Sequence, residues 1–195
     1  VRAIPRKGSP PLRDISLHTS SAINNFSIPT SVVGISKIQV RLNQTEKVIE
    51  NCNGAWSESS GTGVTVSAET EDRREGSASN KFVIAGSGTA GDIIASQTVS
   101  LDLSKFTHVE FWFKSTVTLT SGQVKLVLST TANAATETEL LSLPAITAGT
   151  WTYVRLALAN PLSDSAIISV GFEYDVDIGA VTYQADAIRG TVANS

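Results

Sequence analysis

Acidic side chains repeat at every second position near the C-terminal end of the sequence, at Glu173, Asp175 and Asp177. A glycoside hydrolase needs two carboxyl groups on opposite sides of the bond that it cleaves, about 5 to 9 Å apart. Residues at i, i+2 and i+4 of a strand share one face instead, so these three predict a solvated strand face or, alternatively, a second metal site. The histidines, His18 and His108, complete no Ser-His-Asp constellation and are expected at the surface. We therefore expect a protein that is not an enzyme.

The sequence contains one cysteine, Cys52, which excludes an intrachain disulfide and a thiolate metal cage. A nucleophilic cysteine needs a base beside it, and the sequence offers few candidates. We expect Cys52 to be a small buried apolar residue.

A glycine motif, G-x-G-x-x-G, is formed by Gly86, Gly88 and Gly91 directly after an apolar run. A dinucleotide site also needs a following helix that presents its N-terminus to the pyrophosphate. The residues that follow, IIASQTVSLDLS, are β-branched and favour another strand. The motif therefore predicts a hairpin loop and not a nucleotide site.

Short β-rich runs separated by turn residues follow one another from residue 47 to residue 188. Several alternate apolar and polar side chains with period two, as in HVEFWFKS (108–115), which is typical of strands with one buried face. The turns, among them Asn160-Pro161 and Ile178-Gly179, are spaced as in a sandwich or barrel. The expected strands are 47–51, 63–69, 79–85, 95–103, 108–115, 123–130, 138–144, 150–158, 166–174 and 181–188.

The first 47 residues differ from the rest in charge and in proline content. They contain seven basic and two acidic residues, whereas residues 48–195 contain eight basic and sixteen acidic residues. Four prolines within the first 30 residues favour an extended path, and scattered apolar side chains indicate an arm that becomes ordered against another surface. Residues 31–42 alternate well enough for a strand on the body or on a neighbour's sheet. The arm residues expected to dock are Arg2, Arg6, Lys7, Arg13 and Phe26.

Nucleic acid and membrane are not expected as partners. The arm lacks the aromatic interleaving and dense basic clustering of a nucleic-acid tail. No apolar run reaches the length of a membrane span, and the first residues contain no hydrophobic region of a secretion signal.

Residues 48–190 resemble the jelly-roll family of carbohydrate-binding modules and the related sandwich domains of bacteriophage virion proteins. The likeness rests on the order of VIENCNGAW (48–56), REGSASNKFVI (74–84), VSLDLSKFTHVEFWFKS (99–115), LPAITAGTWTYVRLAL (143–158) and VTYQADAIRG (181–190). It implies an all-β, antiparallel jelly-roll β-sandwich at 48–190, behind an extended arm at 1–47 and before a tail at 191–195. It says little about function, because this sandwich serves unrelated tasks.

The resemblance also implies a structural Ca²⁺ near the edge of the sandwich. The matching positions are Glu50, Ser77 with the Glu75 carbonyl group, and Asp186. Carboxylate and carbonyl oxygens are the ligands that Ca²⁺ prefers. The alternative is that Glu50 and Asp186 hydrogen-bond the amides of turns at the rim.

Three tryptophans are candidates for stacking against sugar rings, as the resemblance implies for an aromatic platform. Trp112 alternates away from Phe111 and Phe113, so it forms either a second layer of the core or an exposed platform, which Trp56 would extend. Trp151 matches a core position of the family.

Two functions follow from these features. The first is a structural protein of a bacteriophage virion, a capsid decoration or tail component, with arm 1–47 docking onto other virion proteins and the chain forming a homo-oligomer. The second is a carbohydrate-binding module attached to glycans. The arm favours the first, because no hydrolase accompanies the sandwich here.

Overall fold

The computed structural model describes residues 46–58, 63–86 and 89–192, and these residues form strands and two short 3₁₀ helices. Residues 1–45 of the predicted arm 1–47, which include its docking residues and His18, lie outside the described residues. No helix in the described part of the chain is long and apolar enough to cross a membrane. The strands are β1 (Glu46–Glu50), β2 (Ser57–Glu58), β3 (Val64–Glu69), β4 (Ser79–Ile84), β5 (Ile93–Leu101), β6 (His108–Ser115), β7 (Val124–Ser129), β8 (Glu139–Ser142), β9 (Thr152–Ala157), β10 (Ile167–Tyr174) and β11 (Val181–Thr191); the helices are η1 (Ala132–Ala134) and η2 (Pro161–Ala166).

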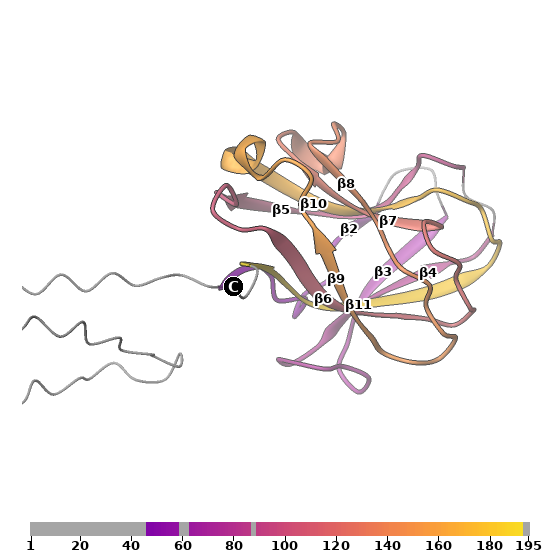
Figure 1. Cartoon of the computed structure of the whole chain (residues 1–195). Helices are drawn as coiled ribbons and strands as arrows, with labels where there is room; N and C mark the ends of the chain where they lie inside the picture. Colours follow the sequence, from indigo (N-terminus) through magenta and orange to yellow (C-terminus); the bar gives the residue numbers. More distant parts are fainter. Residues whose placement is uncertain (1–45, 59–62, 87–88, 193–195) are drawn as a thin grey trace, which may run out of the picture. The chain divides into compact units, whose positions relative to one another are not determined.

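The strands form two antiparallel sheets, which Figure 1 shows as two layers. Sheet A has the order β3-β4-β11-β6-β9, and β1 pairs with β11 beside this path. Sheet B has the order β2-β5-β10-β7-β8. The chain crosses between the sheets several times, from β4 to β5, from β5 to β6 and from β6 to β7. This is the antiparallel jelly-roll β-sandwich that the sequence predicts.

An aromatic cluster fills the space between the sheets. The ring of Phe172 on β10 lies 5.4 Å from that of Phe113 on β6, 5.8 Å from that of Phe82 on β4 and 5.6 Å from that of Trp56. Such ring pairs contribute about 0.5–1.5 kcal/mol each beyond the area that they bury. The cluster thus joins residues from both sheets into one core.

Side chains of β6 point alternately into this core and to the opposite side of sheet A. Val109, Phe111 and Phe113 are buried in the core, so the residues between them point away from it. We call this side of sheet A the outer face. A register shift at Ala187, whose φ is +54°, lets both Asp186 and Arg189 of β11 contribute to the outer face.

Two details of the predicted layout change. Strand β1 begins at Glu46 and β11 ends at Thr191, so the first and last strands extend beyond the predicted limits of 48 and 190. The glycine-rich segment does not close a hairpin, because β4 belongs to sheet A and β5 to sheet B. After Gly91 the chain enters β5 and not a helix, so the geometry of a dinucleotide site is absent from residues 89–101.

Candidate functional site

An aromatic pair lies at the centre of the outer face. Trp112 on β6 and Tyr153 on the neighbouring β9 are direct partners across the two strands. Their ring centroids are 4.9 Å apart and the rings are tilted by 59°. Trp112 is half-buried, and the Tyr153 side chain is 50% exposed. Of the two alternatives for Trp112, the structure therefore shows the outer face and not the core.

The loop between β3 and β4, residues 70–78, borders this pair. Its Arg74 is exposed, and the guanidinium carbon lies 4.4 Å from the centroid of the Trp112 ring. A cation at this distance is attracted by the negative face of the indole. Trp112 thus lies between an aromatic neighbour on its own sheet and a cation from the loop.

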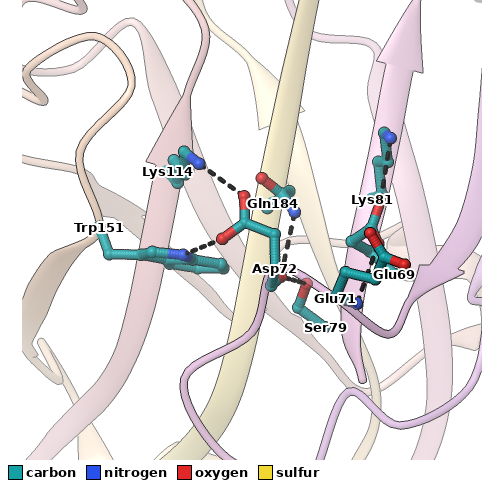
Figure 2. A network of polar contacts seen from close by, with 8 residues as sticks. All are labelled: Glu69, Glu71, Asp72, Ser79, Lys81, Lys114, Trp151 and Gln184. Atoms are coloured by element: carbon teal, nitrogen blue, oxygen red, sulfur yellow. Dashed lines mark hydrogen bonds and ion pairs between the residues drawn. The ribbon is translucent and has the colours of Figure 1, made fainter. Parts of the chain in front are cut away.

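Asp72 connects the same loop to β4, β6, β11 and the residue that precedes β9. Figure 2 shows its carboxylate between Lys114, whose Nζ lies 2.5 Å from Oδ2, and Trp151, whose Nε1 donates to Oδ1 at 2.7 Å. The Asp72 carbonyl oxygen accepts from Gln184 Nε2 at 3.2 Å and from Ser79 Oγ at 2.8 Å. The hydrogen bond from Lys114, followed by that from Trp151, holds the pKa of Asp72 below its usual range.

The core position expected for Trp151 is therefore wrong. Its indole N–H needs an acceptor, and Asp72 supplies one on the polar side of the sheet.

Charged side chains continue the outer face on the other side of the aromatic pair. The Tyr153 hydroxyl donates to Glu110 Oε2 at 2.6 Å, and Arg155 Nε lies 2.8 Å from Glu110 Oε1. Arg189 pairs with Glu46 at 3.0 Å and also with Glu75. Partial burial, together with Glu110, raises the pKa of Tyr153 to about 12, so its hydroxyl stays protonated and donates.

Asp186 fixes the backbone of the β3–β4 loop. Its buried Oδ2 accepts the N–H groups of Arg74 at 2.7 Å and of Glu75 at 2.8 Å. Asn53 Oδ1 accepts two more loop amides, those of Ser77 at 2.8 Å and Ala78 at 3.1 Å. Because these bonds hold the loop backbone, the position of Arg74 beside Trp112 follows from the fold.

The four residues expected to bind Ca²⁺ only partly fit that ion. Glu50 Oε1 accepts the N–H of Cys52 at 3.0 Å, and the side chain of Glu75, whose carbonyl group is the expected ligand, pairs with Arg189. Ser77 is exposed, and nowhere in 46–58, 63–86 and 89–192 do three His, Cys, Asp or Glu side chains gather as a metal-binding group. Asp186 Oδ1, however, is buried without a hydrogen-bond partner, which is the state that a cation would relieve. Calcium at Asp186 remains a prediction.

Trp56 does not extend the platform. Its side chain is 4% exposed, and its ring is stacked on Phe172 with an interplanar angle of 13°. It lies just before β2, where the chain turns into the core, so it contributes to packing and cannot reach a ligand on the outer face.

The expected acidic strand face is also wrong in part. Strand β10 ends at Tyr174, and Glu173 is 3% exposed, while Asp175 and Asp177 follow the strand. The segment between β7 and β8 covers Glu173, because Ala134 packs on Gly171 and the Ala134 N–H donates to Ser169 Oγ at 2.9 Å.

Cys52 behaves as expected. It is fully buried, and burial raises the pKa of its thiol to about 12. His108 begins β6, and its Nδ1 lies 2.9 Å from the hydroxyl oxygen of Thr107.

Among the outer-face residues that sequence reasoning missed are Asp72, Arg74 and Tyr153. Tyr153 could have been found, because it alternates with the apolar Val154 in TWTYVRL and lies two positions after Trp151. Asp72 and Arg74 belong to a loop, where no period assigns a side chain to a face.

Solved structures similar to this chain include carbohydrate-binding modules, while no family model and no curated protein matches its sequence. The family 11 carbohydrate-binding module of the cellulosomal cellulase Lic26A-Cel5E of Clostridium thermocellum has a TM-score of 0.51 at 19% identity, over 76% of this chain and 95% of that chain. A family 11 module from Clostridium thermocellum in complex with a β-1,3-1,4-mixed-linked tetrasaccharide has a TM-score of 0.52 at 18% identity, over 76% and 96%. The CBM22-1-GH10 modules of the Clostridium thermocellum xylanase Xyn10B, complexed with xylohexaose, have a TM-score of 0.50 at 17% identity, over 77% of this chain and 29% of that chain.

These similarities establish the fold. The expected likeness to jelly-roll carbohydrate-binding modules is confirmed, whereas no finding links the chain to bacteriophage virion proteins.

Proposed function

We propose that this chain is a carbohydrate-binding module that binds a glycan on the outer face of sheet A. The observation that carries the proposal is the pair of Trp112 and Tyr153, which lies on a solvent-facing side of the sandwich among polar side chains. An aromatic ring packs against the apolar face of a pyranose, and polar side chains around the ring form the hydrogen bonds that fix the orientation of the sugar.

The polar groups around the pair match a sugar ligand. Glu110 and Asp72 offer acceptors on either side, and Lys114 and Gln184 offer donors. All of them are held by neighbours within the face, so a ligand would meet a preformed surface, and little ordering cost opposes binding. The similar structures named as carbohydrate-binding modules support the same function.

Titration with a panel of soluble polysaccharides tests this proposal. The substitutions W112A and Y153A are each expected to weaken binding about tenfold or more, the loss of about 1.4 kcal/mol typical of a central aromatic contact. L162A is the control, because Leu162 is highly exposed in η2 and belongs to no sheet face. Far-ultraviolet circular dichroism establishes that each variant is folded. Unchanged binding by the double variant W112A/Y153A, or no binding of any polysaccharide by the wild type, would refute the proposal.

The second candidate is the structural role in a bacteriophage virion. It rests on the difference in charge between residues 1–47, in which basic residues outnumber acidic ones, and the rest of the chain, in which acidic residues outnumber basic ones. A chain truncated before Asn43 that still entered its assembly would contradict it, since arm docking is its premise.

A further inference from the structure

Four cations surround the aromatic pair on the outer face, and three of them are matched by carboxylates. Lys114 pairs with Asp72, Arg155 pairs with Glu110, and Arg189 pairs with two glutamates. The guanidinium of Arg74 differs. None of the ion pairs among the described residues includes Arg74, and the contact of its guanidinium is the Trp112 ring.

The surroundings of Arg74 prepare it for an anion. Its backbone N–H is bound by Asp186, so the residue is fixed at its Cα, and the ring of Trp112 limits where the guanidinium lies. Contact with the ring face leaves the N–H donors at the edge of the guanidinium available. These donors form a planar fork that fits a carboxylate in a bidentate manner.

We propose that the glycan bound on the outer face is acidic, and that Arg74 binds the carboxylate of a uronic acid residue while Trp112 and Tyr153 contact the sugar rings. The inference rests on the proposed carbohydrate-binding function and specifies its ligand class. Arg74 is then the residue that determines specificity for acidic over neutral glycans.

The charges on the outer face favour a glycan in which few of the sugar residues are acidic. Asp72 and Glu110 each pair with one cation, and Arg189 is shared by Glu46 and Glu75, so the carboxylates of the face are already engaged and Arg74 is the cation at Trp112 without a carboxylate partner among the described residues. A single uronate meets that charge, whereas a polymer with a negative charge on every residue would also face these carboxylates at short range. The ligand class is therefore a neutral backbone with occasional uronic acid residues.

A matched pair of ligands tests the inference. Xylan bearing glucuronic acid side groups is compared with the same xylan after chemical reduction of its carboxyl groups, which removes the charge and retains the linkages. The wild type is expected to bind the acidic form about tenfold more tightly, as one charge-assisted interaction provides. This preference should decrease with added NaCl, because the interaction is exposed.

The ratio of the two affinities within each variant is the readout, so a general change of affinity does not affect it. R74Q should bring the ratio close to one, and R74K should retain part of the preference. K105Q removes one positive charge from the loop between β5 and β6 and should leave the ratio as in the wild type. Polygalacturonate and heparin should bind more weakly than the sparsely acidic xylan.

The outcomes separate this inference from the proposed function. Equal affinity of the wild type for both xylans, or an unchanged ratio in R74Q, would overturn the role of Arg74 while W112A and Y153A still report on glycan binding. Tighter binding of heparin than of the acidic xylan would assign Arg74 to sulfate and also overturn the inference. If the wild type bound none of the glycans, the proposed carbohydrate-binding function itself would be contradicted.

Discussion

Gly76 shows how closely the β3–β4 loop is fitted to its supports. Its φ is +63°, and a Cβ atom there would lie 2.4 Å from Asn53 Oδ1, the oxygen that accepts the amides of Ser77 and Ala78. A side chain at this position therefore meets both backbone strain and a contact with the amide that holds the loop.

We predict that G76A lowers the free energy of unfolding by about 2–3 kcal/mol, as strain at a special φ combined with a lost loop contact does. G149A is the control, because Gly149 has a φ of +71° but no atom within 4 Å of its Cβ position, so only the backbone strain of about 1 kcal/mol remains. Urea denaturation measures both. Equal losses in the two variants would show that the contact with Asn53 contributes nothing.

Asp186 is the residue at which we test for calcium binding. Burial raises the pKa of this carboxyl group, and its Oδ1 has no partner, so a cation that reached it would stabilise the folded state. At a Ca²⁺ concentration of 100 times Kd, the gain is about 2.7 kcal/mol. For a chain of this size this corresponds to roughly 5–10 °C in Tm.

The measurement compares the Tm in CaCl₂ with the Tm in a chelator. The wild type should respond, and D186N should not, because the amide retains the hydrogen-bond acceptor for Arg74 and Glu75 but loses the charge. If the chelator leaves the Tm of the wild type unchanged, Asp186 serves only the loop amides.

At the scale of elements, the segment between β7 and β8 places a second carboxyl group against Glu173. Burial, and then Glu137 of this segment, raises the pKa of Glu173 to about 7, while Lys125 of β7 opposes the shift and Asp175 adds to it. Two ionised carboxylates cannot hydrogen-bond each other, so the contact needs a proton on one of them.

A carboxyl group with a raised pKa in the folded state binds its proton more tightly than in the unfolded chain. Its contribution to stability is therefore fully present below the unfolded value of 4.5 and is lost as the pH rises through about 7. We predict that unfolding becomes easier between pH 5 and pH 8, by on the order of 2 kcal/mol. E173Q should flatten this dependence.

Asp164 is the comparison for this experiment, because burial raises its pKa to about 6 and gives it the same direction at a different place. D164N should remove only the lower part of the decrease. A wild-type stability that rose from pH 5 to pH 8 would contradict the role of both groups. Denaturant midpoints across this pH range provide the measurement.

The strands and the loops differ in what the sequence predicts about them. HVEFWFKS predicts β6 at its true ends and places Trp112 opposite to Phe111 and Phe113, because period-two alternation encodes the two faces of a sheet, but it leaves open whether that side is a second core layer or an exposed platform. The same rule fails for Glu173, since a segment from another part of the chain covers that side of sheet B. The period-two rule assigns no face to four further residues, because they lie outside strands and their side chains are oriented by tertiary contacts. These residues are Trp56, Trp151, Asp72 and Arg74.

At the scale of the whole molecule, residues 43–195 form one compact unit that contains the entire described core. The aromatic cluster joins both sheets, and every strand that the structure describes lies within this unit. A single shared core of this size unfolds as one cooperative unit in most proteins.

We therefore predict that a fragment of residues 43–195 unfolds in one transition, with a Tm within about 3 °C of the full chain, a difference of less than about 1 kcal/mol. It should also bind the acidic xylan as the full chain does, because every residue of the outer face belongs to it. Calorimetry and titration of the fragment beside the full chain provide the measurement. A much lower Tm would show that residues 1–42 contribute to the stability of the sandwich. Loss of glycan binding from a folded fragment would show instead that they contribute to the ligand site, and would move part of the recognition away from Trp112, Tyr153 and Arg74.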